Sequence, residues 1–176
     1  EMAEFVDTWG RLAMPDYLPH VFWVAGGSLG VENALKAAFD WKVRKNFRKG
    51  HTAEKGTQVM HFKEAFHGRS GYALSMTNTA DPKKYQYFAH FDWPRVSNPK
   101  LRFPLNEDER ERVRRAENDT LDQVKNAYAT RRHEICAIIL EPIQAEGGDN
   151  HFRPEFLRAL RDVAHENESL LIFDEV

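Results

Sequence analysis

Four short clusters of glycine, polar and aromatic residues in this chain could carry chemistry. They are Gly26-Gly27-Ser28, Phe66-His67-Gly68-Arg69, residues 141–148 (EPIQAEGG) and Asp174-Glu175-Val176. Each follows an apolar run typical of a buried β-strand. In the same order, those runs are Val21–Val24, Thr57–Lys63, Ile135–Leu140 and Leu170–Phe173. Carboxyl ends of parallel strands meet at one edge of a sheet, so the clusters are expected to converge on one crevice.

The first cluster has the composition of a phosphate-binding turn. Its glycines allow the backbone to approach a ligand closely, and Ser28 adds a hydroxyl group. The helix expected after it would present free N–H groups and a positive dipole end to an anion. An ordinary strand-to-helix turn uses the same residue types, so this cluster alone leaves both interpretations open.

The fourth cluster permits two kinds of chemistry. A carboxylate after an apolar strand can bind the metal of an ATPase, or it can pair with the ring nitrogen of a cofactor. The ATPase interpretation requires a glycine-rich loop that ends in Gly-Lys, and the chain contains no Gly-Lys dipeptide. Asp174 therefore remains either a cofactor partner or a plain strand end.

Metal and nucleophile sites have weaker support. The eight histidines form no HExxH pattern, and Cys136 lies inside an apolar run, where it is expected to be a small core residue. Ser28 and Ser70 lack the glycine-flanked turn of a nucleophilic serine. We predict no metal.

Helical patterns separate the apolar runs. They cover Met2–Ala13, a stretch from Leu29 to Lys49, a stretch from Asn106 to about Thr130, and a stretch that begins at Pro154. Residues 81–104 hold four prolines and no sustained period, which indicates an ordered surface excursion. Strands that alternate with helices predict an α/β fold with a mostly parallel sheet.

Composition narrows the class of protein. The chain has 176 residues and 25 Lys+Arg against 27 Asp+Glu, so its net charge of −2 favours neither nucleic acid nor an anionic membrane as partner. The basic residues between Lys42 and Lys49 suit a helix C-terminus better than a nucleic-acid patch. A single cysteine, and no apolar run long enough to span a bilayer, favour a soluble cytoplasmic protein.

The four clusters, in this order, resemble the class III (ω-) pyridoxal-phosphate aminotransferases. The motifs that carry the resemblance are GGSLGVENALKAAFDWK, AFHGRSGYALSMTNT, FDWPR, EPIQAEGGDNHFRPEF and LLIFDEV. The resemblance implies the large domain of a fold-type-I enzyme, similar to aspartate aminotransferase. The sequences of these motifs are most similar to those of family members that transfer the ε-amino group of L-lysine to 2-oxoglutarate, giving glutamate and 2-aminoadipate 6-semialdehyde.

The resemblance also implies cofactor contacts for pyridoxal 5'-phosphate. The turn at Gly27 and Ser28 matches the one that binds the phosphate. Phe66 and Val176 match the residues on the two faces of the pyridine ring. His67 and Asp174 complete the set: His67 matches a residue that supports the pocket, and Asp174 matches the carboxylate that pairs with the ring nitrogen.

Two further residues match substrate contacts. Arg69 matches the position that grips the substrate α-carboxylate, and a guanidinium can do so bidentately. Glu146 matches a gate residue that pairs with a second arginine while lysine is bound. Ala145 stands where the family usually has glycine, so a positive φ at this position would be strained.

The same resemblance predicts that residues 1–176 are the N-terminal part of the cofactor-binding domain, truncated before the Schiff-base lysine, with no catalytic lysine of their own. A homodimer is implied for the full-length protein. Two alternatives remain: a class III enzyme that acts on ornithine, acetylornithine or 4-aminobutyrate, and a non-catalytic binding fragment of the same fold.

Overall fold

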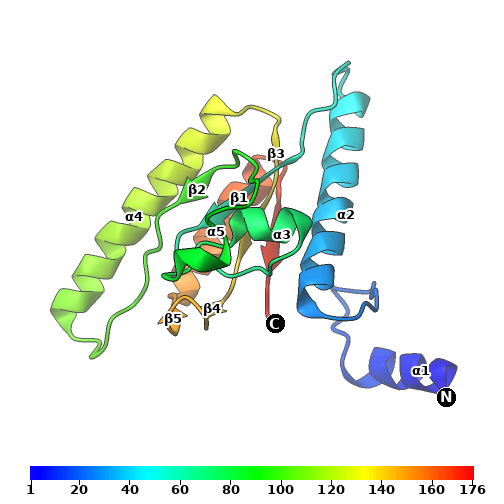
Figure 1. The fold of residues 1–176 in the computed structure, drawn as a ribbon, viewed down its shortest axis with the longest axis horizontal. Coiled ribbons are helices and arrows are strands. Elements are labelled where there is room, and N and C mark those ends of the chain that lie inside the picture. The colour runs from blue at the N-terminus through cyan, green and yellow to red at the C-terminus, as the bar shows by residue number, and fades with distance from the viewer.

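The most apolar run of the chain forms the centre of a parallel sheet. The computed structural model describes all of residues 1–176, and in it Ile135–Leu140 becomes β3, with all six residues buried. Strand β1 (Gln58–Phe62) pairs with one edge of β3 and β6 (Leu170–Phe173) with the other, both in parallel. The short β2 (Arg95–Val96) extends the sheet beyond β1, giving the order β2-β1-β3-β6 (Figure 1).

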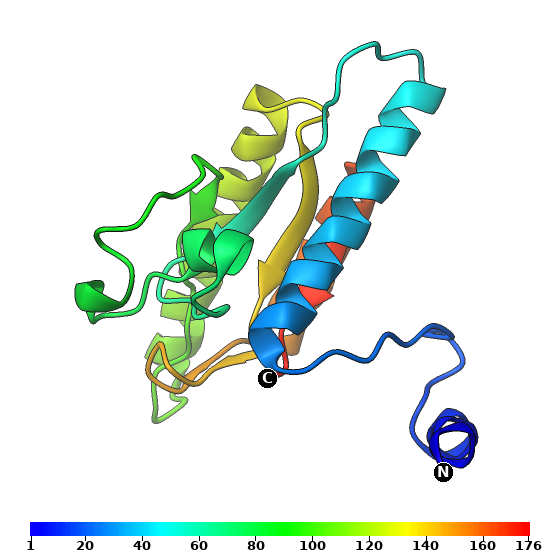
Figure 2. The same cartoon turned by 45° about the vertical axis from the view of Figure 1, so that its right-hand side comes forward.

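Helices cover both faces of this sheet. On one face α2 (Gly27–Arg48) and the short α3 (Gly71–Met76) pack with Val59, Ala137 and Ile139 in one apolar cluster. On the other face α4 (Glu107–Thr130) and α5 (Pro154–Glu166) pack with Met60, Ile138 and neighbouring residues in a second cluster. Figure 2 shows the sheet between these two helical layers. The predicted α/β fold with a parallel sheet is confirmed.

Local signals set the helix boundaries. The Asn106 side chain accepts a hydrogen bond from the Glu109 N–H at 2.9 Å and caps α4, so the helix begins where its pattern predicts. Pro154 occupies the first turn of α5, where its missing N–H costs nothing. The helix predicted from Leu29 begins two residues earlier, at Gly27. No helix combines the length and apolar character that a membrane crossing requires.

Several elements escape sequence analysis because they are short. Residues 81–104 contain a 3₁₀ turn, η1 (Pro82–Lys84), as well as β2. After β3, residues Ile143–Gln144 (β4) and Asn150–His151 (β5) form a two-stranded antiparallel hairpin. This hairpin carries Glu146 in its turn, at the carboxyl edge of the sheet.

Two strand predictions need correction. Val21–Val24 is not a buried strand: it pairs with no other strand, and its four side chains are exposed. A strand requires a neighbour to satisfy its backbone groups, and no neighbour lies beside this segment. Leu170–Phe173 is a strand, but it lies at the sheet edge and is only partly covered, with Phe173 exposed.

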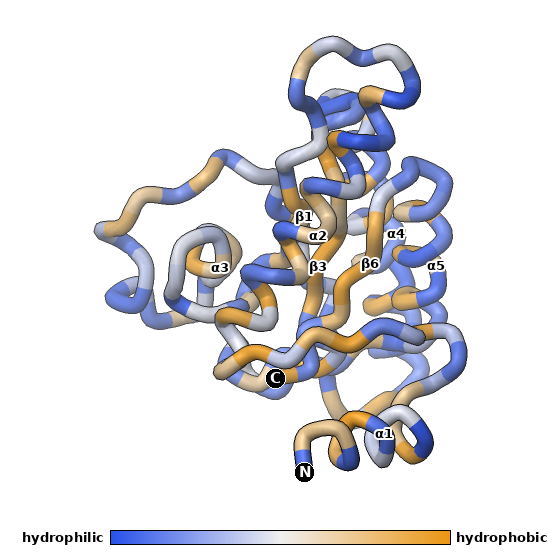
Figure 3. Tube along the Cα trace, turned by 90° about the vertical axis from the view of Figure 1, so that its right-hand side faces the viewer, coloured by the Kyte–Doolittle hydropathy of each residue, from blue (hydrophilic) through white to orange (hydrophobic).

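The N-terminal segment stands apart from the layered fold. Helix α1 (Met2–Leu12) forms as predicted but buries none of its residues. Its Phe5 and Trp9 rings instead contact Trp23 at centroid distances of 5.2 and 5.0 Å. Figure 3 shows α1 and the apolar segment before α2 below the sheet, and Figure 1 shows α1 set apart from the layered helices and strands.

Candidate active site

The predicted clusters meet in one cavity of about 230 Å³ at the carboxyl edge of the sheet. The loops after β1, β3 and β6, the first turn of α2 and the β4–β5 hairpin all contribute to its walls. Seven of the eight predicted site residues line it: Gly27, Ser28, Phe66, His67, Glu146, Asp174 and Val176. Gly68, Glu141 and Ala145 complete the lining.

The first turn of α2 faces this cavity with free backbone N–H groups. An α-helix leaves the N–H groups of its first turn without intrahelical partners, and no side chain caps this one. A Cβ atom at Gly27 would lie 2.6 Å from Val176 Cγ1, so a larger residue there would require the Val176 side chain to move. The turn therefore offers an anion N–H donors and the positive end of a helix dipole.

Hydrogen bonds hold this turn against the loop after β1. The hydroxyl groups of Ser28 and Ser70 lie 2.5 Å apart, and Ser70 donates to Glu32 Oε1 at 3.1 Å. The same Glu32 oxygen accepts from the Ala73 N–H at 3.1 Å. Glu32 therefore joins α2 to the start of α3. The supporting roles of Ser70 and Glu32 are not predictable from the sequence, because only the packing of α3 on α2 brings these residues together.

A buried His–Asp pair lies at the floor of the site. His67 Nδ1 is 2.8 Å from Asp174 Oδ2, and both side chains are almost fully buried. Asp174 Oδ1 accepts from the Val176 N–H at 3.3 Å. His67 Nε2 is buried and has no hydrogen-bond partner. The pair fixes the orientation of the Asp174 carboxylate at the cavity.

Glu141 is a second buried carboxyl group in the cavity wall. Its Oε1 accepts from the Phe66 N–H at 2.8 Å, which ties the loop after β1 to the end of β3. Burial raises the pKa of Glu141, and the Phe66 N–H opposes that increase. Sequence analysis placed Glu141 in the third cluster without giving it a role, although its position directly after a central strand was a usable signal.

The β4–β5 hairpin presents Glu146 at the rim of the cavity. Its carboxylate forms an ion pair with Lys84 of η1. Ala145 is not among the residues with positive φ, so the strain expected from its replacing glycine does not arise. Positive φ values fall instead on Gly148 and Asp149, later in the same turn.

Arg69 does not join the other predicted residues. Its side chain is exposed, does not line the cavity and makes no hydrogen bond or ion pair. Its proposed contact with a substrate carboxylate therefore stays a prediction. No group of three or more His, Cys, Asp or Glu side chains is arranged to hold a metal ion.

Comparisons with known proteins agree with this geometry. The aminotransferase class-III family model matches residues 1–176. The L-lysine-epsilon aminotransferase of Mycobacterium bovis is 51% identical over 175 residues, which is 99% of this chain and 38% of that protein. The protein of the same name from Streptomyces clavuligerus is 46% identical over 99% of this chain and 37% of its own length. Human mitochondrial 4-aminobutyrate aminotransferase is 32% identical over 92% of this chain and 35% of its own length.

A solved structure matches the fold equally well. A lysine aminotransferase from M. tuberculosis, in its internal aldimine form, superposes with a TM-score of 0.92 at 50% identity. The match covers 98% of this chain and 39% of that one, so the chain spans somewhat over a third of the proteins it resembles. With the family model matched from the first residue to the last, the chain belongs to the class III aminotransferases.

Proposed function

We propose that this chain is the N-terminal part of the cofactor-binding domain of a lysine ε-aminotransferase. In that enzyme the ε-amino group of L-lysine passes to 2-oxoglutarate, giving glutamate and 2-aminoadipate 6-semialdehyde. The observation that carries the proposal is the single cavity that unites the α2 N-terminus with the His67–Asp174 pair. The relatives named as L-lysine-epsilon aminotransferases, 46–51% identical over nearly all of this chain, support the substrate.

The residues present fit pyridoxal 5'-phosphate. The free N–H groups at Gly27 and Ser28 suit its phosphate, and the absence of a side chain at Gly27 leaves the backbone of this turn open to the ligand. Phe66 offers an aromatic wall to a flat heterocycle. When bound, this cofactor supplies an electron sink for the substrate carbon that loses a proton.

We propose that the Asp174 carboxylate accepts a hydrogen bond from the protonated ring nitrogen of the cofactor. A carboxylate at hydrogen-bond distance favours the protonated form of a pyridine. His67 binds the other side of that carboxylate at 2.8 Å and keeps it aimed into the cavity. Because both side chains are buried, water does not compete for these contacts. We therefore assign Asp174 the catalytic role and His67 a supporting one.

Glu146 and Arg69 are proposed to act on the substrate. Glu146 lines the cavity and pairs with Lys84, which supports a role for its carboxylate in binding a cationic group at the rim. Arg69 is exposed and unpaired, so its guanidinium is free to bind a carboxylate that enters from solvent. Anchoring the α-carboxylate away from the reacting centre would place the ε-amino group there.

Isotope transfer tests the substrate and the regiochemistry together. The full-length protein that carries this chain is incubated with pyridoxal phosphate, 2-oxoglutarate and L-lysine labelled with ¹⁵N at either the ε or the α position. We expect labelled glutamate from ε-labelled lysine only. If glutamate forms from ornithine, acetylornithine or 4-aminobutyrate but not from lysine, lysine is not the amino donor. Because some relatives are named 4-aminobutyrate aminotransferases, 4-aminobutyrate is the second candidate donor. If no imine absorption band appears with pyridoxal phosphate, the chain is a non-catalytic module.

Two wider predictions belong to the same proposal. A homodimer would cover part of the apolar surface formed by α1 and Val21–Val24, and sedimentation equilibrium of the full-length protein measures its mass directly. A cytoplasmic location rests on the single cysteine, Cys136, which is buried and free.

A further inference from the structure

Glu64 lies two residues before Phe66, in the loop that leaves β1, and adopts a backbone conformation that glutamate rarely takes. Its φ is +63°, in the left-handed region where the Cβ atom of an L-residue crowds the backbone. Such conformations persist only where surrounding contacts enforce them, and they concentrate at functional sites. The contacts of Glu64 lead to two other segments of the chain.

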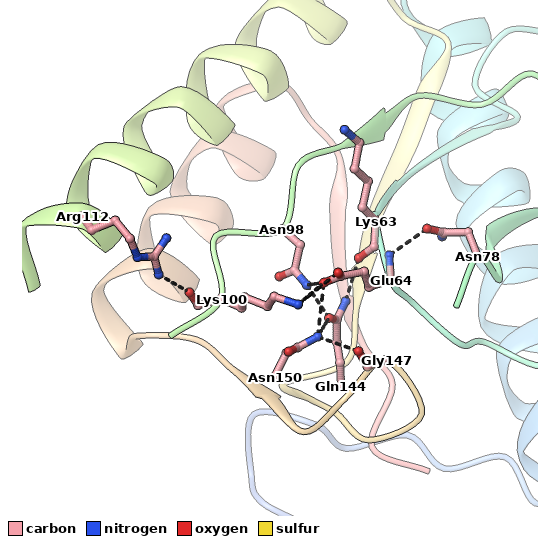
Figure 4. Close-up of polar contacts among 9 residues, drawn as sticks. All are labelled: Lys63, Glu64, Asn78, Asn98, Lys100, Arg112, Gln144, Gly147 and Asn150. Atoms are coloured by element: carbon pink, nitrogen blue, oxygen red, sulfur yellow. Dashed lines mark hydrogen bonds and ion pairs between the residues drawn. The ribbon is translucent and has the colours of Figure 1, made fainter. Parts of the chain in front are cut away.

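Three side chains from outside the loop bind the Glu64 carboxylate (Figure 4). Lys100 Nζ donates to both of its oxygens, at 3.0 and 2.8 Å. The side-chain amides of Asn98 and Asn150 donate to Oε2 at 2.7 and 3.3 Å. The same two amides also donate to Gln144 Oε1, at 2.6 and 3.0 Å. Hydrogen bonds to an ionised carboxylate are the stronger kind, so this cluster is a firm anchor.

The backbone around Glu64 contacts the β4–β5 hairpin directly. Gln144 Nε2 donates to the Lys63 carbonyl at 3.1 Å. The Glu64 carbonyl oxygen lies against Gly147, so closely that a Cβ atom there would collide with it. On its other side, the Glu64 N–H donates to Asn78 Oδ1 at 2.7 Å. The loop after β1 and the hairpin are therefore held together through backbone as well as side chains.

Both of these segments line the candidate active site, whereas Glu64 itself does not. Phe66 and His67 follow Glu64 in the loop, and Glu146 precedes Gly147 in the hairpin. We propose that Glu64 is a positioning residue that locks the two segments together, and so fixes Phe66 and His67 relative to Glu146. The inference deepens the proposed function and rests on it, because Phe66 and His67 matter there as walls of a cofactor site.

The test uses the full-length protein with Glu64→Ala, Glu64→Gln and, as matched control, Lys63→Ala. Lys63 is adjacent and exposed, and only its backbone takes part in the cluster. Two readouts are taken: the dissociation constant of pyridoxal phosphate with the visible circular dichroism of the bound cofactor, and amide hydrogen exchange in the cofactor-free protein.

For Glu64→Ala we expect cofactor affinity to fall about tenfold and the dichroic band to weaken, since loss of a residue that orients binding groups lowers affinity by about 10–100-fold at metal sites. Exchange should accelerate together in residues 64–70 and 145–148. Glu64→Gln keeps an acceptor for Asn98 and Asn150 but loses the ion pair with Lys100, so both signals should lie between those of Glu64→Ala and those of the unsubstituted protein. Lys63→Ala should match the unsubstituted protein. If Glu64→Ala does not fold, Lys100→Met removes the ion pair alone and should shift both readouts in the same direction.

Equal values for Glu64→Ala and Lys63→Ala would overturn the inference, as would faster exchange in the loop alone. Failure of the unsubstituted protein to bind pyridoxal phosphate would instead overturn the proposed function. In that case the exchange data still decide whether Glu64 locks the loop to the hairpin.

Discussion

His61, one of two buried histidines, should make the stability of this fold depend on pH. His61 lies on β1 with its imidazole buried, and its Nε2 accepts a hydrogen bond from Arg95 Nε at 3.0 Å. Its proton therefore sits on Nδ1, which lies 3.3 Å from the Val59 carbonyl. Protonation of Nε2 would remove the acceptor and place two cations together. Burial first, and Arg95 second, lower the pKa of His61 from 6.5 to about 3.

The sign and size of the effect follow from that difference. Above the unfolded-state pKa of 6.5 both states are neutral at His61, so the residue adds no pH dependence. Between pH 6.5 and about 3, His61 is protonated in the unfolded chain but neutral in the folded chain. The free energy of unfolding therefore decreases as the pH is lowered through this range. At about 1.36 kcal/mol per pH unit, the loss is about 2 kcal/mol at pH 5 and approaches about 5 kcal/mol near pH 3.

Urea unfolding at about pH 7.5 and about pH 5, followed by far-UV circular dichroism, measures this loss. His61→Gln is the comparison, because its amide oxygen can still accept from Arg95 but does not titrate. Other groups titrate alike in both proteins, so their difference isolates His61. We expect the unsubstituted chain to lose about 2 kcal/mol more than His61→Gln between these pH values. Equal losses would refute the assignment of a neutral buried imidazole.

Three other substitutions test a tight backbone contact, the catalytic carboxylate and a buried lysine. Gly68 has a φ of +113°, and a Cβ atom there would collide with Ser28, whereas Gly50 has a φ of +90° and open space around it. Thermal unfolding should therefore show Gly68→Ala destabilised by about 1–3 kcal/mol more than Gly50→Ala. Equal losses in the two variants would contradict the tight contact between Gly68 and Ser28. Asp174→Ala should leave the full-length protein folded and able to bind cofactor but lower kcat by a factor of about 100 or more, and near-normal turnover would remove its catalytic role. Lys42→Met deletes two hydrogen bonds from Nζ to carbonyl groups just after α5. Urea unfolding should therefore show a free energy of unfolding lower by about 1–3 kcal/mol, while cofactor affinity stays constant. Weaker cofactor binding would show that this distant end of α2 influences the site.

Sequence periodicity predicts those helices and strands whose position is determined by signals within their own segment. The apolar run Ile135–Leu140 is buried on both sides, and the cap at Asn106 and the proline at 154 mark helix starts, so β3, α4 and α5 were predictable. Convergence of the four clusters was predictable as well, since parallel strands end at one edge. The family then supplied roles that spacing alone left open, such as that of Asp174.

Features that depend on a tertiary neighbour were not predictable. Val21–Val24 has the composition of a strand but lacks a strand beside it, and a strand cannot form alone. Within residues 1–176, Leu170–Phe173 pairs with β3 on one side only, although its composition resembles that of a central strand. The contacts of Glu141 with Phe66 and of Glu64 with Lys100 join residues distant in sequence, so no local pattern reveals them.

The most direct test of the central claim is the ¹⁵N NMR spectrum of the full-length protein loaded with pyridoxal phosphate labelled at its ring nitrogen. We expect a chemical shift typical of a protonated pyridine near neutral pH, and a move toward the unprotonated value in Asp174→Asn. A ring nitrogen with the same shift in both proteins would show that Asp174 is not its partner, and that the cavity at the end of β6 is not the cofactor site.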